Sequence, residues 1–202
     1  MISSPEFDKI LDHNEEIIWT GRPNPTVFYL SGLPGLIFGL LWGSFDYFGF
    51  IRHMTSKEAG FMIPFFMLHL FPLWLGVGNM FRLFFVLKNT EYAITNRRLL
   101  IRGGFWGISF KSVDYDRIEE TDVTVNPIEK ILNVGSIKFF SGARTSRGSN
   151  LYDRFVGIPD PYDVYKKIKQ TTVDVKTDWN YPNAIRPGQN PGYSSEYTAP
   201  EN

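Results

Sequence analysis

Hydrophobic and polar positions divide the chain into an apolar part and a part with alternating polarity. Residues 27–45 contain no charged side chain, and residues 61–81 contain none apart from a possible proton on His69. A short polar connection separates these two runs. From residue 91 onward, apolar and polar positions alternate with the period of a half-buried strand. The pattern predicts helices first and a domain rich in β-strands after them.

Both uncharged runs are long enough to cross a bilayer as helices. The nineteen residues of the first run span roughly 28 Å, which is about the thickness of the hydrocarbon layer. A core helix of a soluble protein normally carries a polar stripe with a period of 3.6, and neither run has one. We therefore expect a transmembrane helical hairpin over residues 27–87, with two buried helices of a soluble protein as the alternative. We do not expect a cleaved signal peptide, because the first run lacks a basic leader and a second run follows it.

Small residues recur every four positions around the first run. They place four small side chains on one helix face, where another helix backbone can approach closely. The partner is either the second run, which brings Gly76 and Gly78, or a second copy of the protein. The four positions are Ser31, Gly35, Gly39 and Gly43.

His69 lies near the middle of the second run. An ionisable side chain at that depth is costly and points to a function by default. No carboxylate or lysine is expected at the same depth, because Asp46 and Arg82 are predicted at the ends of the runs, within reach of water. A structural role, with the imidazole bonded to Ser31, Asn79 or a backbone carbonyl, is the favoured interpretation.

The orientation of the hairpin follows from the basic residues beside the two runs. More of them lie on the side of the two termini than in the connection, so both termini are expected in the cytoplasm. The terminal side carries Arg22, Arg82, Lys88, Arg97 and Arg98, and the connection carries Arg52 and Lys57.

The second part of the chain predicts an antiparallel α+β domain. Residues 91–95 and 98–104 form a hairpin around a turn at Asn96 and Arg97. Asn126, followed by Pro127, predicts the start of a short helix, and Asp160, followed by Pro161, predicts that of a terminal one. Further strands are expected at residues 107–113, 118–125, 135–140 and 151–157.

Candidate chemistry is sparse. The chain has no cysteine, so disulfides and thiolate metal sites are excluded, and its three histidines lie far apart in the sequence. The charges cancel, with 21 basic and 21 acidic residues, which disfavours a nucleic-acid partner. Glu119, Glu120 and Asp122 lie on alternating faces of one predicted strand. We therefore expect no enzyme, no cofactor and no metal.

Three motifs resemble the bacterial membrane proteins with a pleckstrin-homology-like (PH-like) domain. They are "EEIIWTGRP" (15–23), "YAITNRRLLIRGG" (92–104) and "DRIEETDVTVNPIEKILNVGSIKF" (116–139), with the two apolar runs after the first. The resemblance implies a seven-stranded, bent antiparallel barrel over residues 88–170, capped by a C-terminal helix. It also implies a leader over residues 1–26 and a non-enzymatic binding role. Asn96–Arg98 is much shorter than the basic loop of inositol-phosphate-binding PH domains.

The resulting hypothesis is a scaffold anchored in the bacterial cytoplasmic membrane, which binds a protein partner or a second copy of itself. The alternative is a component of a transport or enzymatic complex that uses His69. A candidate patch for anionic lipid comprises Lys88, Arg97, Arg102 and Lys111. For Arg97 and Arg98, the alternative is a salt bridge, for instance to Asp116 or Glu119.

Two further expectations concern the ends of the chain. In the leader, a short helix is expected around Phe7, and Trp19 is expected near the membrane interface, which tryptophan favours. The tail over residues 171–202 is rich in proline and lacks apolar periodicity, so it is expected to be disordered.

Overall fold

The structure is a computed structural model that describes residues 5–146 and 148–180. Within them the chain forms two compact units. The β-rich unit comprises the residues before Pro25, Thr90–Arg102 and the residues from Ser109 onward; the helical unit comprises Pro25–Asn89 and Gly103–Ile108. Most of the tail that was predicted to be disordered, residues 181–202, lies outside the described residues.

The first sheet of the β-rich unit contains four strands in the order β1-β2-β3-β4. The predicted hairpin around Asn96 is present: Tyr92 pairs with Ile101, and Ile94 pairs with Leu99. The strands are β1 (Ile17–Gly21), β2 (Glu91–Thr95), β3 (Arg98–Gly103) and β4 (Ser109–Asp114).

The second sheet contains three antiparallel strands in the order β5-β6-β7. The described strands therefore form two sheets and no closed barrel, which corrects the predicted barrel; the α+β class and the C-terminal helix are confirmed. The elements are β5 (Glu120–Thr124), α5 (Pro127–Ile131), β6 (Val134–Arg144), β7 (Asn150–Pro159) and α6 (Pro161–Asn180).

The helix α6 continues beyond its predicted end. It was expected to stop near residue 170, but it extends to Asn180. Lys176 fixes this extension, because its Nζ atom donates a hydrogen bond to the carbonyl oxygen of Ile118 at 2.5 Å. Val164 and Ile168, on the inner face of the same helix, are buried in the core. Residues 171–180 therefore belong to the fold.

The strand β1 comes from the segment that was predicted to be a separate leader. It pairs with β2, with Gly21 opposite Tyr92, so the whole helical unit up to Asn89 is inserted between two neighbouring strands of one sheet. Trp19 on this strand is buried and stacks on Phe155, with ring centroids 6.1 Å apart. Trp19 is thus a core residue, and the prediction of an interfacial position for it is wrong.

Phe7 also joins the β-rich unit. Residues 5–10 form turns in place of the expected short helix. The Phe7 ring is fully buried against Ala93 and Leu100, on the opposite side of the first sheet from Trp19. Both faces of the sheet are thus partly covered by residues that precede the helices.

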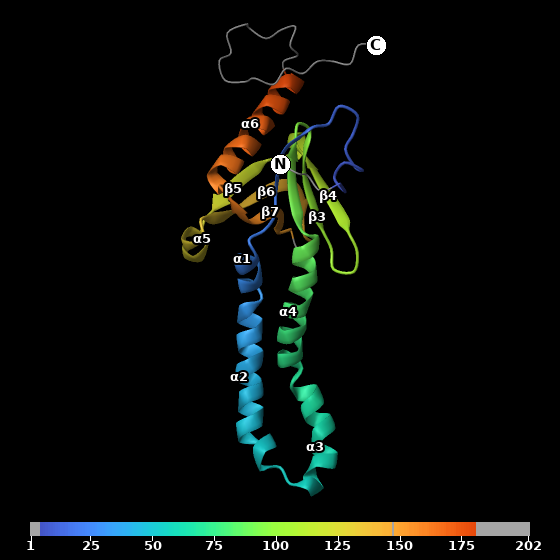
Figure 1. The fold of residues 1–202 in the computed structure, drawn as a ribbon, viewed down its shortest axis with the longest axis vertical. Helices are drawn as coiled ribbons and strands as arrows, with labels where there is room; N and C mark the ends of the chain where they lie inside the picture. Colours follow the sequence, from blue (N-terminus) through green and yellow to red (C-terminus); the bar gives the residue numbers. More distant parts are fainter. Residues whose placement is uncertain (1–4, 147, 181–202) are drawn as a thin grey trace. The chain divides into compact units, whose positions relative to one another are not determined.

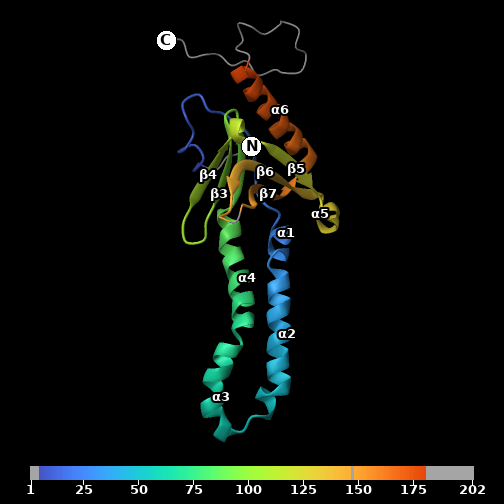
Figure 2. The same cartoon turned by 180° about the vertical axis from the view of Figure 1, so that it is seen from behind.

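The helical unit consists of two long arms joined by a short connection. The structure breaks each predicted run, because Pro34 and Pro72 each occupy the beginning of a helix, where proline is tolerated. The arms contain α1 (Pro25–Leu30), α2 (Leu33–Gly49), a 3-10 turn (Ile51–His53), α3 (Ser56–His69) and α4 (Phe71–Asn89). In both views α2 and α4 run side by side (Figures 1 and 2).

Length and composition single out one helical segment as a candidate membrane span. The residues Leu33–His53 are long and apolar enough to cross a bilayer. Met62–His69 and Phe71–Asn89 meet the same criteria only together, and they are bent by 49° where they join. Among the described residues these are the segments that meet the criteria, so the predicted two-helix hairpin stays a proposal.

Candidate functional site

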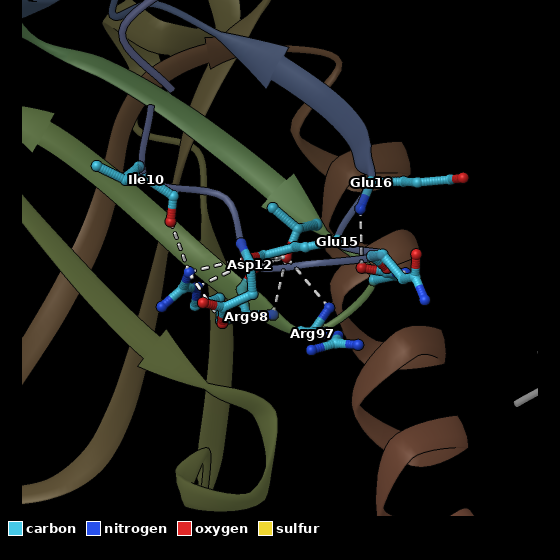
Figure 3. A network of polar contacts seen from close by, with 9 residues as sticks. Ile10, Asp12, Glu15, Glu16, Arg97 and Arg98 are labelled. Atoms are coloured by element: carbon cyan, nitrogen blue, oxygen red, sulfur yellow. Dashed lines mark hydrogen bonds and ion pairs between the residues drawn. The ribbon is translucent and has the colours of Figure 1, made fainter. Parts of the chain in front are cut away.

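Arg98 ties the first residues of the chain to the β2–β3 turn (Figure 3). Its Nε and Nη2 atoms donate to the two carboxylate oxygens of Glu15 at 3.0 and 2.8 Å. Nη2 also donates to the carbonyl oxygen of Ile10 at 2.9 Å, and it lies 3.3 Å from a carboxylate oxygen of Asp12. Arg98 therefore forms a salt bridge, but its partners are carboxylates of the leader and not Asp116 or Glu119.

Glu15 is the buried end of this network. Its side chain is fully buried and also accepts hydrogen bonds from Thr95 Oγ1 at 2.7 Å and from the backbone N–H of Asp12 at 2.8 Å. Burial alone raises the pKa of Glu15, but the hydrogen bonds from Arg98, Asp12 and Thr95 outweigh it and hold the pKa below 4.5. The hydrogen bond to Glu15 raises the pKa of Arg98. Both groups are charged at neutral pH, and the network holds the fold together.

Arg97, the neighbouring residue, has a different environment. Its side chain is exposed, and no described residue is found in an ion pair with its guanidinium. Its backbone N–H donates to Thr95 Oγ1 at 3.1 Å, which fixes the turn. The turn lies at the far end of β2 from Glu91, the first residue of that strand. Arg97 is therefore an exposed cation at that end of the sheet.

The other three residues of the predicted lipid patch differ in their exposure and in their partners. Arg102 is only 8% exposed and forms ion pairs with Glu6 and, at 3.6 Å, with Glu91, so it does not belong to an exposed patch. Lys111 is exposed but forms an ion pair with Asp153 at 2.6 Å. Lys88 lies in the helical unit, where its Nζ atom sits 4.4 Å from the centre of a phenylalanine ring.

Two buried tyrosines of the β-rich unit have structural hydrogen-bond partners. The Tyr115 hydroxyl donates to the carbonyl oxygen of Thr95 at 2.7 Å, and burial raises its pKa. The Tyr92 hydroxyl accepts a hydrogen bond from the backbone N–H of Val156 at 3.2 Å, and burial raises its pKa to about 12. Both hydroxyls stay protonated near neutral pH, so neither is an activated nucleophile.

The face of small residues on α2 packs against α4 of the same chain. A Cβ atom on Gly39 would lie 2.7 Å from the Pro72 carbonyl oxygen, and one on Gly76 would lie 2.8 Å from that of Gly35. These two positions need glycine, because the opposing atoms belong to the backbone. A Cβ atom on Gly35 itself would meet nothing within 4 Å. Ser31 lies between α1 and α2, and its Oγ atom donates to the carbonyl oxygen of Phe28 at 2.6 Å. A Cβ atom on Gly43 would meet the side chains of Leu73 and Leu70.

His69 has a carboxylate partner that the sequence analysis did not anticipate. Its Nδ1 atom lies 2.9 Å from Oδ2 of Asp46, whose side chain is fully buried. The rings of Trp42 and Phe65 flank the imidazole, with centroids 5.2 and 5.1 Å away. The second carboxylate oxygen of Asp46 has no hydrogen-bond partner among the described residues. The predictions that Asp46 reaches water and that no carboxylate lies at the depth of His69 are wrong.

The spacing of these two residues does not reveal the pair. The polar connection predicted from the sequence covers residues 46–60, and folding the chain about its centre would bring Asp46 level with Gly60. The structure instead begins α3 at Ser56, so the second arm starts earlier than its uncharged run and His69 comes level with Asp46.

Comparison with known proteins assigns the fold to a family. The family model described as bacterial PH domain matches residues 35–172, which is more than half of the chain. The chain belongs to the bacterial PH domain family. No curated protein matches the chain significantly. From here on, we call the β-rich unit the PH-like domain.

Two solved structures with PH domains are similar to this chain over most of its length. A pleckstrin-homology protein from Shewanella loihica has 12% identity and a TM-score of 0.39, covering 83% of this chain and 90% of its own. A pleckstrin homology domain from Shewanella amazonensis has 11% identity and a TM-score of 0.40, covering 84% of this chain and 95% of its own.

The PH-like domain is a general binding module. Its buried polar groups, among the described residues, bond to one another and stabilise the fold. The buried charges Glu15, Glu91 and Arg102 are all engaged in ion pairs within the domain. Among the described residues, no group of three or more histidine, aspartate or glutamate side chains could hold a metal ion. The features left for function are the exposed surface of the domain, the His69–Asp46 pair and the apolar surface of the helices.

Proposed function

We propose that this protein is anchored in the bacterial cytoplasmic membrane by its helical unit and holds its PH-like domain at the cytoplasmic surface as a non-enzymatic scaffold. The observation that carries the proposal is the outward exposure of apolar side chains on the helices. Only 11% of the most apolar window of Leu33–His53 is buried, whereas a core helix of a soluble protein is mostly buried. Leu41, Phe45, Leu68 and Leu75 are among the exposed side chains.

The connectivity supports a hairpin that crosses the bilayer and returns. β1 and β2 pair directly, although the helical unit lies between them in the sequence. Both ends of that unit must therefore lie on the same side of the membrane, which one span cannot achieve. Two crossings satisfy the requirement, and the excess of basic residues near the termini supports the cytoplasm as that side.

The scaffold binds a protein partner or a second copy of the chain. Anchoring the PH-like domain raises its effective concentration for any partner at the same surface, so a modest intrinsic affinity is sufficient. The polar groups support binding over catalysis, because the buried ones are engaged in holding the domain together.

Reporter fusions test this topology. We expect a reporter that is active only in the cytoplasm to work when it is fused after Asn180, and a reporter that is active only in the periplasm to work when it is inserted at Lys57. Each reporter at the other position serves as the control and is expected to be silent. A cytoplasmic reporter that works equally well at both positions would show that the helices do not cross the membrane.

The His69–Asp46 pair favours a second candidate function. A buried carboxylate bonded to an imidazole in an apolar helical unit is a common feature of proton-handling and transport sites. In this alternative, the protein belongs to a membrane transport or enzymatic complex in which the pair binds and releases a proton. The scaffold needs the pair only for helix packing.

Replacing both partners with apolar residues separates the two functions. His69→Phe combined with Asp46→Leu leaves no unpaired buried charge, so the double variant is expected to insert and accumulate normally. The scaffold proposal predicts that the double variant restores the wild-type phenotype when it is expressed in a strain that lacks the protein. Failure to restore it at normal abundance in the membrane fraction would favour the proton-handling function. Asp46→Leu alone, which leaves His69 without its partner, is the control for the effect of an unpaired group.

A further inference from the structure

The loop between β3 and β4 is attached to the end of α4. Gly103–Ile108 groups with the helical unit and not with the PH-like domain. The Asn89 side-chain amide donates to the carbonyl oxygen of Gly104 at 3.0 Å, and the Phe105 and Phe85 rings lie 5.9 Å apart. Gly104 has a φ of +135°, and a Cβ atom there would lie 2.1 Å from the Gly107 carbonyl oxygen. The loop is therefore a tight turn with fixed contacts to the helix end.

The same loop presents its largest side chain to the outside. Trp106 is 94% exposed, and Ile108 is 45% exposed. The Trp106 ring packs edge to face with the Phe105 ring, with centroids 5.0 Å apart. Single exposed apolar residues are common on protein surfaces. A tryptophan that is almost wholly exposed and held beside the end of an apolar helix is a more specific arrangement, because the indole ring favours membrane interfaces.

The charges on α4 mark the depth of this loop. Arg82 and Lys88 are the two basic residues of α4, and both are exposed. Phe85, which contacts the loop, lies between them, about 4.5 Å along the helix axis from each. Long basic side chains near the end of a span extend toward the headgroups while their stems stay in the apolar layer. Phe85 and the loop beside it are thus at the level of the headgroups once α4 is inserted.

We propose that Gly103–Ile108 is a membrane-contacting loop in which Trp106 enters the headgroup layer of the phospholipid bilayer. This inference rests on the proposed insertion of the helical unit and names the partner of one further part of the chain. The basis of the contact is the indole ring and not the basic patch that the sequence suggested.

The absence of cysteine from the sequence makes a direct test possible. In the full chain, Trp106→Cys is labelled with an environment-sensitive fluorophore and reconstituted in vesicles of phosphatidylcholine and phosphatidylglycerol. We expect the emission of the fluorophore to be blue-shifted. We also expect its quenching to be several-fold stronger by lipids with a spin label near the headgroup than by lipids with a spin label deep in the acyl chain. Trp106 has few contacts within the protein, so its replacement is not expected to affect folding.

Two matched positions make the outcomes distinct. Leu41→Cys, at a residue 66% exposed on α2, reports on insertion of the helices, and Tyr162→Cys, at a residue 59% exposed on α6, reports on a surface outside this loop. Lipid quenching at position 41 without quenching at position 106 would overturn the loop proposal alone. Absence of quenching at position 41 would overturn the proposed membrane anchoring. A blue shift at position 106 that depends on protein density and resists lipid quenching would assign Trp106 to a protein contact and also overturn the loop proposal.

Discussion

Replacing residues 25–89 with a short glycine-rich linker is expected to give a folded, water-soluble PH-like domain. Gly21 and Tyr92 are paired neighbours in adjacent antiparallel strands, so the two cut ends lie close together. A connection of about four residues is typical between such strands. The buried core of Trp19, Phe155 and Ile168 belongs to the retained part. Size-exclusion chromatography without detergent, circular dichroism and thermal unfolding check the result.

A fragment that begins at residue 88 provides the contrast, because it lacks β1 and the leader. Its core loses Trp19, and Arg98 loses Glu15. Removing one large aromatic core side chain costs about 3–5 kcal/mol, a large part of the total of about 5–15 kcal/mol for a domain. We expect this fragment to be unfolded or aggregated. If the fragment and the linker variant unfolded with equal cooperativity on heating, β1 would be dispensable for folding of the domain.

The second large effect is expected for Arg98→Met. It leaves the fully buried Glu15 carboxylate without its guanidinium partner, and breaking a buried ion pair in this way costs about 3 kcal/mol or more. For a domain of this size, that lowers the melting temperature by roughly 10 °C. Arg97→Met is the matched control, because that side chain is exposed and unpaired among the described residues, and its melting temperature is expected to stay unchanged. Differential scanning fluorimetry in detergent micelles measures both.

The same pair predicts a dependence of stability on pH. The pKa of Glu15 in the folded protein is held below 4.5, so its contribution to stability is fully present above pH 4.5 and is lost as the pH falls through the folded pKa. Glu15→Gln is expected to be less stable at neutral pH and to lose less stability on acidification below pH 4.5. Parallel loss of stability in Glu15→Gln and in the unaltered protein would show that other carboxylates dominate.

The elements that the sequence predicted well are those with local signals. The hairpin on both sides of Asn96 depends on alternation and on turn residues within one short segment. The short helix begins directly after Asn126 because this N-cap residue and Glu129 form a reciprocal capping box, and both members lie within four consecutive residues. The two apolar runs were visible because a long absence of charge is also a local property.

The features that were missed depend on residues far apart in the sequence. Arg98 bonds to a carboxylate 83 positions away, and turn chemistry alone cannot choose between that partner and a nearer acid. Trp19 was assigned to the membrane interface because apolar runs follow it, but pairing of β1 with β2 brings it into the core. The separation of the two sheets was missed for a similar reason. Closure of a barrel requires the edge strands of the two sheets to pair, and the pattern of apolar positions within each strand does not reveal that pairing.

Under the proposed membrane anchoring, the interruption of the sheet by the helical unit makes assembly of the domain depend on the insertion of both arms. Gly21 and Tyr92 are 71 positions apart. At a synthesis rate of about 5–20 residues per second, β2 is therefore synthesised roughly 4–14 s after β1. A chain that had inserted only one arm would leave the two strands on opposite sides of the bilayer. Its Trp19 would remain unburied, and the incomplete sheet would be open to proteases. If the helical unit anchors the protein as proposed, a native PH-like domain would therefore exclude a chain in which only one arm had crossed.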